Sequence, residues 1–263
     1  MDRKFILLSL FLAFSAVLCA AQEQDKKTAE LAKVDDKEKI ANTIRIVLAG
    51  DSTVNHSSGW GSGFCDDLVG HVECFNMSKN GRSTKSYRNE GWWQRALDLK
   101  PTYILISFGG NDVPGKGPER ETDPKTTYPE LLKKDIEEAL AAGAKPVLVT
   151  PMQTRKYDDG KLQQPWAAYA EAMRKVGAET NTPIVDLNAH SLACFETMTQ
   201  EQADVYNFKF YPERSSTVDR GHVNGKGSQM LGTMVAEDLV KVVPALANYL
   251  MMHDPPVENP ACR

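Results

Sequence analysis

The sequence predicts an α/β protein in which helices cover both faces of a parallel sheet. Short apolar runs rich in Ile, Val and Leu have the length of buried strands, at 44–49, 72–77, 102–107, 146–150 and 183–186. Helical periodicity fills segments between or after them, at 128–142, 166–180 and 227–250. Because strands that alternate with helices form βαβ units, we expect the strands to run parallel in one sheet.

Length and composition agree with a single domain. The chain has 263 residues, of which 41% are hydrophobic and 25% charged, as in ordinary globular proteins. No internal repeat or linker divides the body of the chain. The net charge is −4 and no basic tract occurs, so we expect no nucleic-acid partner.

The N-terminus has the pattern of a secretory signal peptide. Charged residues at 2–4 precede an apolar run at 5–18 and small residues at 19–21. The run is shorter than the roughly 20 residues that a membrane span needs. A lipid anchor on Cys19 is the alternative, although the residues before it fit that pattern poorly. We therefore expect a signal peptide over 1–21 and a secreted or periplasmic protein.

The remaining chain divides by composition. Residues 22–42 form a charged tail with almost no aromatic side chains. The predicted domain spans 43–252, and 253–263 form a C-terminal tail. We expect a monomer without a membrane span.

Export changes the interpretation of the cysteines. Loss of Cys19 leaves an even number, which permits two disulfides in an oxidising compartment. The simplest pairing is Cys65–Cys74 and Cys194–Cys262, and free thiols are the alternative. No cysteine or histidine cluster has zinc spacing, so no structural metal is expected.

Polar residues follow three of the predicted strands. The first strand ends at Gly50-Asp51-Ser52-Thr53, the second is followed by 80–83, and the third by 109–112. An Asp-Ser pair alone is more often a turn or a helix cap. In open parallel sheets, however, sites form beyond the carboxyl ends of the strands. This placement favours Ser52 as a nucleophile, with Asp51 shaping its turn.

A serine nucleophile needs a base and an acid that orients the base. Among the five histidines, His222 lies just before the last predicted helix, with Asp219 three residues upstream. One tight loop would present both side chains together. The motif Asp-x-x-His is weak alone and gains weight only together with Ser52.

An oxyanion hole would complete such a site. The N–H groups of Ser52 and Gly81 and the side-chain amide of Asn111 are candidate donors from three neighbouring strand ends. A turn glycine at 81 and a helix cap at 111 are the structural alternatives, and their joint placement favours the functional interpretation.

Four blocks stand in the order found in the SGNH (GDSL-type) hydrolases, which the chain resembles. They are "GDST" around Ser52, "NGRSTKSY" from Asn80, "GGND" from Gly109 and "DRGH" ending at His222. The segments "PGKGPERETDP" and "KPVLVTPMQTR" are similar to the rhamnogalacturonan acetylesterase group. The resemblance covers roughly residues 44–249.

The resemblance implies a three-layer α/β/α sandwich with a five-stranded parallel sheet of flavodoxin-like order. It implies Ser52 as nucleophile, His222 as general base and Asp219 as its orienting acid. It also implies an oxyanion hole from Ser52, Gly81 and Asn111, and no metal or organic cofactor. The G-x-S-x-G elbow of the α/β-hydrolases is absent.

Two features concern the substrate. The group often has Gly-His-Asn-Asp where this chain has Gly110 in the second position, which weakens the substrate assignment. We expect Arg82 and Trp93 to bind substrate, since aromatic faces suit sugar rings and a cation suits an acidic polysaccharide. Trp92, Lys85 and Arg88 lie nearby, and burial or solvation are the alternatives for all five side chains.

The sequence thus predicts an exported serine esterase that removes O-acetyl groups from a plant-type polysaccharide, rhamnogalacturonan or pectin. Alternatives are an acetylxylan or other carbohydrate acetylesterase, and a GDSL lipase or acyl thioesterase. Polar loops near the site disfavour the apolar acyl channel of the latter two. A non-catalytic carbohydrate-binding domain is the alternative from a different class, and the complete catalytic set disfavours it.

Overall fold

The computed structural model describes residues 26, 43–209, 218–251 and 262. The chain divides into two units, Met1–Thr43 and Ile44–Arg263. The predicted signal peptide and almost all of the predicted charged tail and C-terminal tail lie outside the described residues, so these predictions are not tested.

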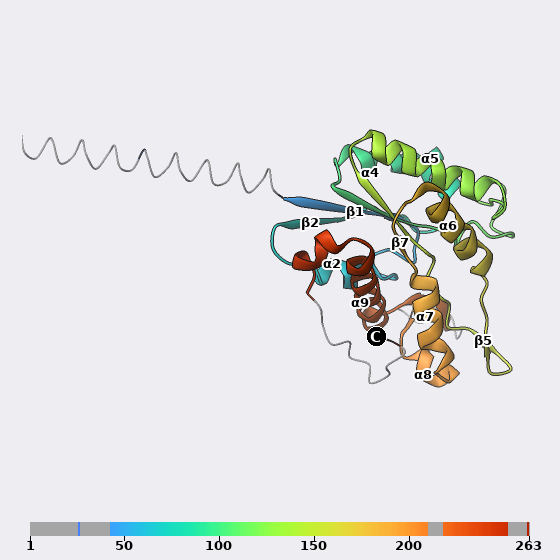
Figure 1. The fold of residues 1–263 in the computed structure, drawn as a ribbon. Helices are drawn as coiled ribbons and strands as arrows, with labels where there is room; N and C mark the ends of the chain where they lie inside the picture. Colours follow the sequence, from blue (N-terminus) through green and yellow to red (C-terminus); the bar gives the residue numbers. More distant parts are fainter. Residues whose placement is uncertain (1–25, 27–42, 210–217, 252–261, 263) are drawn as a thin grey trace, which may run out of the picture. The chain divides into compact units, whose positions relative to one another are not determined.

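A five-stranded parallel sheet forms the centre of the second unit, as predicted (Figure 1). Its strand order is β2-β1-β3-β4-β7, the flavodoxin-like order. The strands are β1 (Ile44–Gly50), β2 (Val72–Asn76), β3 (Tyr103–Ser107), β4 (Lys145–Val149) and β7 (Ile184–Val185). Each overlaps one of the five apolar runs. Because β1 lies between β2 and β3, the segment after β1 is flanked on both sides by other strand ends.

Successive side chains of the strands enter two separate cores. In β1, Ile46 and Leu48 pack on one face of the sheet, and Val47 and Ala49 pack on the other. Both cores are buried, which explains why the inner strands β1, β3 and β4 are apolar along most of their length instead of alternating with polar residues.

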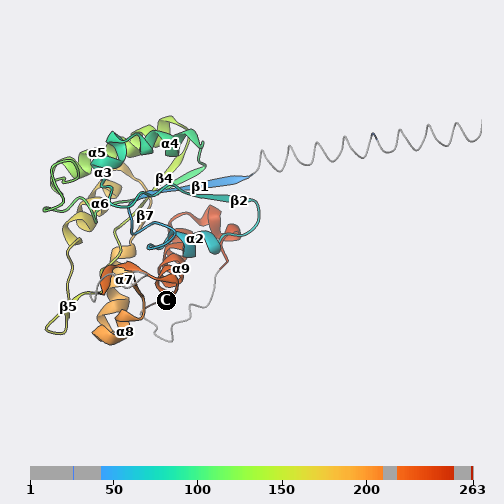
Figure 2. The same ribbon diagram turned by 180° about the vertical axis from the view of Figure 1, so that it is seen from behind.

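Helices cover both faces, which completes the three layers (Figures 1 and 2). One layer contains α3 (Thr84–Asn89), α4 (Trp92–Asp98), α5 (Thr127–Ala141) and α6 (Ala167–Thr180). The other contains α2 (Gly61–Asp66), α7 (Leu187–Glu196) and α9 (Gly225–Val242). The remaining short elements are α8 (Gln200–Asp204), the 3-10 helix η1 (Pro244–Tyr249), and the two-stranded pairs β5 (Tyr157–Asp158) with β6 (Lys161–Leu162) and β8 (Asn207–Phe208) with β9 (Asp219–Val223).

Two expectations need correction. The helix predicted over 227–250 is interrupted, because α9 ends at Val242 and η1 begins at Pro244, whose ring does not continue an α-helix. The segment that carries Asp219 and His222 is a strand, β9, where a loop was expected.

Glycines bring α2 and α9 into close contact. A Cβ at Gly63 would lie 2.2 Å from the carbonyl oxygen of Ser228, and one at Gly232 would lie 2.3 Å from the backbone nitrogen of Phe64. Both distances are far below van der Waals contact, so only glycine fits at these positions. Since α9 begins two residues after β9, this packing helps to hold the end of β9 near the sheet.

Both disulfides of the simplest predicted pairing are present. Cys65–Cys74 joins α2 to β2, and Cys194–Cys262 joins α7 to the C-terminal end of the chain. Among the described residues, no helix has the length and apolar character to cross a membrane.

Candidate active site

Ser52 lies in the turn directly after β1. Asp51, which is fully buried, accepts hydrogen bonds from the backbone N–H of Thr53 at 2.8 Å and from its hydroxyl at 2.7 Å. Ser58 donates its hydroxyl to the carbonyl of Ser52 at 3.0 Å. These contacts fix the turn on both sides of the serine, and the carboxylate of Asp51 shapes the turn without contacting the Ser52 hydroxyl.

A chain of hydrogen bonds joins Ser52, His222 and Asp219. His222 Nε2 lies 2.7 Å from Ser52 Oγ, and His222 Nδ1 lies 2.8 Å from Asp219 Oδ2. The other oxygen of Asp219 accepts the backbone N–H groups of Gly221 and His222, at 3.0 and 3.1 Å. One carboxylate therefore orients both the ring and the backbone of the residue that faces Ser52.

Asp219 is suited to remain ionised. Burial alone would raise the pKa of its carboxyl, but the hydrogen bond and charge of His222 and the two backbone N–H groups hold that pKa below its usual value. An ionised carboxylate only accepts hydrogen bonds, so we assign the proton of the neutral imidazole to Nδ1. Nε2 is then free to accept the proton of Ser52.

The three predicted oxyanion donors lie close to one another. Asn111 Nδ2 makes two long hydrogen bonds, one of 3.4 Å to Asp51 Oδ2 and one of 3.3 Å to the carbonyl of Arg82. These acceptors are the neighbours of Ser52 and Gly81 in the chain. Within the described part of the chain, the N–H groups of Ser52 and Gly81 donate no hydrogen bond. They remain available to a negatively charged oxygen.

Gly81 has a specific backbone requirement. Its φ is 75°, in the left-handed region that residues other than glycine rarely adopt. The carbonyl oxygen of Gly81 accepts a 3.4 Å hydrogen bond from Arg120, on the loop after β3. Gly81 thus satisfies both interpretations made from the sequence, as a turn glycine and as a residue placed beside Ser52.

Two buried carboxyl groups, of Asp51 and Asp112, are next in the chain to the predicted oxyanion donors Ser52 and Asn111. Burial raises the pKa of Asp51, and hydrogen bonds from Thr53 only partly oppose it. Burial likewise raises the pKa of Asp112 to about 7, although Thr122 and Thr84 donate to its carboxyl at 3.0 and 3.2 Å. These groups fix the ends of β1 and β3 and do not contact Ser52 Oγ.

The structure explains the glycine at position 110. A Cβ there would lie 3.0 Å from Asp51 Oδ2 and 3.4 Å from the ring of Trp166. The half-buried indole of Trp166, at the start of α6, therefore covers the space that a side chain at 110 would enter. The departure from the family pattern is accommodated by this ring.

The predicted substrate-binding residues have different outcomes. Trp93 is only 3% exposed and lies in the core, where it donates Nε1 to Glu138, so the expectation that it faces substrate is wrong. Arg82 pairs with Glu90 at 2.9 Å and stays partly exposed, so its role remains a prediction.

The other two basic residues near Arg82 also have partners. Lys85 donates to the carbonyl of Pro118, and Arg88 pairs with Asp135 and Glu138 against α5.

An open cavity of about 600 Å³ adjoins Asp219. The residues that line it are Thr154, Lys156, Pro165, Val218, Asp219, Arg220 and Gly221. Its lining mixes the charged side chains of Lys156, Asp219 and Arg220 with apolar surface from Pro165 and Val218.

Sequence reasoning missed Arg155, which ends the segment "KPVLVTPMQTR". This side chain is fully buried and donates Nη2 to the carbonyl of His222 at 2.7 Å. Its position in a block that resembles the acetylesterase group was the available signal, but nothing in the sequence indicates its contact.

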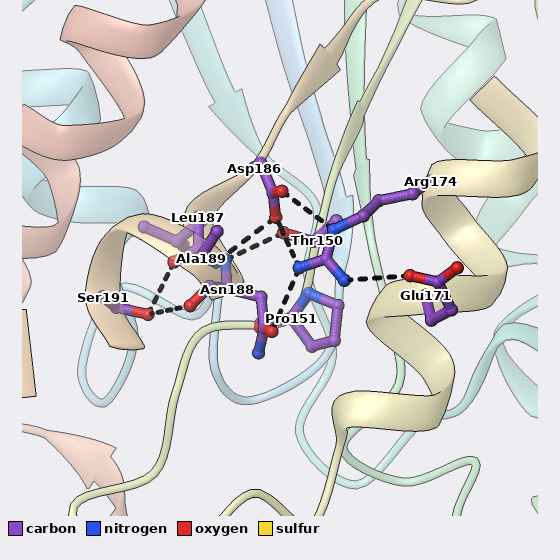
Figure 3. A network of polar contacts seen from close by, with 9 residues as sticks. All are labelled: Thr150, Pro151, Glu171, Arg174, Asp186, Leu187, Asn188, Ala189 and Ser191. Carbon is purple, nitrogen blue, oxygen red and sulfur yellow. Dashed lines mark hydrogen bonds and ion pairs between the residues drawn. The ribbon is translucent and has the colours of Figure 1, made fainter. Parts of the chain in front are cut away.

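Polar contacts at the carboxyl ends of β4 and β7 fix the loop that carries Arg155 (Figure 3). Asn188 donates to the carbonyl of Pro151 at 3.0 Å, and Ser191 accepts the N–H of Gln153 at 2.9 Å. Asp186, at the start of α7, binds both Thr150 and Arg174. The loop is therefore anchored to the N-terminal part of α7 before it reaches the site, and Arg174 of α6 in turn holds Asp186.

Comparison with known proteins agrees with this geometry. Residues 48–230 match the model of the GDSL-like Lipase/Acylhydrolase family. The probable rhamnogalacturonan acetylesterase YesY of Bacillus subtilis is 34% identical over 202 residues, covering 74% of this chain and 91% of that protein. The rhamnogalacturonan acetylesterase RhgT of the same organism is 29% identical over 226 residues, covering 80% and 96%.

A solved structure is similar in fold. The acetyl xylan esterase AlAXEase superposes with a TM-score of 0.57 at 19% identity, covering 76% of this chain and all of that chain. A parallel α/β/α sandwich with a serine–histidine–aspartate chain at the end of its first strand defines an acyl hydrolase of the SGNH class. This chain belongs to the GDSL-like lipase/acylhydrolase family.

Proposed function

We propose that this protein is a serine acetylesterase that removes O-acetyl groups from a plant-type polysaccharide, with rhamnogalacturonan as the first candidate. The observation that carries the proposal is the hydrogen-bond chain Ser52–His222–Asp219 beside the free N–H groups of Ser52 and Gly81. The two relatives described above, both named as rhamnogalacturonan acetylesterases, support the choice of polymer.

In the first half of the reaction, Ser52 Oγ attacks the acetyl carbonyl carbon while His222 Nε2 takes its proton. The carbonyl oxygen becomes negative, and the N–H groups of Ser52 and Gly81 and the amide of Asn111 bind it. Protonated His222 then gives its proton to the sugar oxygen as the ester bond breaks, so the deacetylated sugar leaves and acetyl-Ser52 remains.

Water completes the cycle. His222 removes a proton from water, which attacks the acetyl carbon of acetyl-Ser52, and the same three donors bind the second oxyanion. Collapse returns the proton to Ser52 Oγ and releases acetate. Asp219 remains ionised throughout and stabilises the imidazolium that forms twice in each turnover.

The charged side chains of Lys156, Asp219 and Arg220 in the cavity lining support a sugar substrate over a long-chain lipid. Acetylated xylan is the second candidate, because the acetyl xylan esterase AlAXEase shares the fold. We also propose export, which the signal-peptide pattern at 1–21 and the two disulfides support.

Acetate release by the chain lacking residues 1–21 tests the proposal, with acetylated rhamnogalacturonan and acetylated xylan assayed in parallel. Release that disappears in Ser52→Ala is the expected result, with rhamnogalacturonan the faster polymer. Octanoate and acetate esters of one alcohol separate an acetylesterase from a lipase. A folded protein that releases no acetate from either polymer, or that prefers octanoate, would contradict the assignment.

A further inference from the structure

The guanidinium of Arg155 is fully buried, and among the described residues no carboxylate forms a salt bridge with it. Its Nε donates to Asn207 Oδ1 at 2.6 Å, its Nη2 to the carbonyl of His222 at 2.7 Å and its Nη1 to the carbonyl of Gln153 at 3.3 Å. A buried cation with only neutral acceptors is costly. Burial lowers the pKa of Arg155 to about 10, although the charges of Asp219 and Asp204 oppose that change.

The strand that carries His222 has little support from the sheets. β9 is outside the five-stranded sheet, and within the described ranges it pairs only with the two residues of β8. Arg155 contacts both members of this pair, because Asn207 belongs to β8 and His222 to β9. The backbone N–H of Arg155 also donates to the carbonyl of Arg220 at 3.0 Å, so one residue holds β9 at two positions.

Other contacts hold the C-terminal end of β9, whereas the carbonyl of His222 is bonded to the guanidinium of Arg155. Val223 donates its N–H to the carbonyl of Ser58 at 2.9 Å, and α9 begins directly afterwards. Asp219 orients the imidazole from within the same strand and does not tie that strand to the body of the protein. Of these contacts, the guanidinium alone joins the carbonyl of His222 to a loop anchored on α7.

We propose that Arg155 is a positioning residue that holds the imidazole of His222 within hydrogen-bonding distance of Ser52. It acts by fixing the carbonyl of His222 and the side chain of Asn207 at the same time. The planar guanidinium suits this task, because its donors point in fixed directions toward several acceptors. This inference rests on the proposed function, in which His222 activates Ser52.

The test compares Arg155→Met and Arg155→Lys with the wild type, using p-nitrophenyl acetate and the phosphorylation of Ser52 by diethyl p-nitrophenyl phosphate. Displacement of a catalytic group by about 1 Å costs about 100-fold in rate. We expect kcat and the phosphorylation rate of Arg155→Met to fall together by about that factor, with KM within about twofold. Arg155→Lys retains the positive charge but not the planar set of donors, so its kcat and phosphorylation rate should lie between those of the wild type and Arg155→Met.

Arg88→Gln is the matched control for lost stability. Arg88 is also largely buried, but it pairs with Asp135 and Glu138 in the layer on the other face of the sheet. This variant should melt at a lower temperature than the wild type while its kcat and its Ser52 phosphorylation rate stay within about twofold. Equal losses of rate in Arg88→Gln and Arg155→Met would overturn the proposal.

The remaining outcomes are also decisive. If Arg155→Met does not fold, the test rests on the folded Arg155→Lys variant. A kcat and a phosphorylation rate of that variant within about twofold of wild type would refute the positioning role. A rise in KM with unchanged kcat would also refute it. Failure of the proposed function is recognised separately, because the wild type itself would then neither hydrolyse the ester nor react at Ser52, and both proposals would fall.

Discussion

Ser52 Oγ and His222 Nε2 lie 2.7 Å apart although 170 residues separate them in the chain. The serine is fixed by a turn at the end of β1, and the histidine lies on a strand outside the main sheet. Two segments far apart in the chain therefore meet at this hydrogen bond, and a second one, from the N–H of Val223 to the carbonyl of Ser58, also joins them. The predictions that follow concern how each neighbouring group supports this contact.

Asp219→Asn should lower kcat by about 10³- to 10⁴-fold without unfolding the protein. The amide oxygen of asparagine can still accept the N–H groups of Gly221 and His222, which preserves the local backbone. Its NH₂ group would then face Nδ1 of His222 and place the ring proton on Nε2, which could no longer accept a proton from Ser52. Steady-state kinetics and circular dichroism check this, and retention of more than about a tenth of wild-type kcat would contradict the assigned tautomer.

Asn111→Ala should remain folded and lose about 100- to 1000-fold in turnover. The hydrogen bonds that Asn111 makes in the resting structure are long, at 3.3 and 3.4 Å, so their loss should cost little stability. Its amide contributes mainly when the carbonyl oxygen becomes negative. Thermal unfolding and kcat measured on one preparation separate the two effects, and near wild-type turnover would remove Asn111 from the mechanism.

Gly110→His should destabilise the protein by about 1 to 3 kcal/mol, because the new side chain overlaps Trp166 and crowds Asp51. Trp166→Ala opens that space, so the double variant should lose less stability than the sum of the two single variants. Urea unfolding of the wild type, the two single variants and the double variant gives the coupling free energy between the two positions. Strictly additive losses would show that the two positions do not compete for the same space.

Asp112 should make the protein less stable as pH rises from about 4 to about 7. Burial raises the pKa of Asp112 from its ordinary 3.8 to about 7. Between these values the folded state binds more protons than the unfolded state, so the free energy of unfolding falls with increasing pH.

Asp112→Asn removes this titration and keeps an oxygen that can accept from Thr84 and Thr122. We expect the wild type to lose more unfolding free energy than the variant between pH 5 and pH 8, as measured by urea denaturation. The same change of unfolding free energy with pH in both proteins would show that Asp112 is not protonated in the folded state at pH 5.

Much of the architecture follows from local patterns. The apolar runs predict all five strands, because a strand buried on both faces must be apolar along its length. The helix predicted to continue through 250 shows the limit of periodicity, since Pro244 ends the α-helix before the apolar pattern ends.

Side chains that depend on docking were harder to predict. Trp92 and Trp93 are adjacent, so they point in directions about 100° apart on a helix, and only the packing of α4 decides which is buried. It is Trp93 that enters the core, while the ring of Trp92 faces the ammonium of Lys79, with Nζ 3.9 Å from the ring centroid.

The sequence by itself determined the five apolar strands of the sheet and the residues that gather at its carboxyl edge, including Ser52, Gly81 and Asn111, while the strand order was implied by the family resemblance. Strand ends converge in any parallel sheet of this topology, so these residues are brought together by local rules. The tertiary structure alone decided that a strand, β9, carries His222, that Trp166 occupies the space beside Gly110, and that Arg155 reaches the carbonyl of His222. These contacts join segments far apart in the chain, and their geometry depends on how the helices and loops pack, which no local pattern of residues encodes.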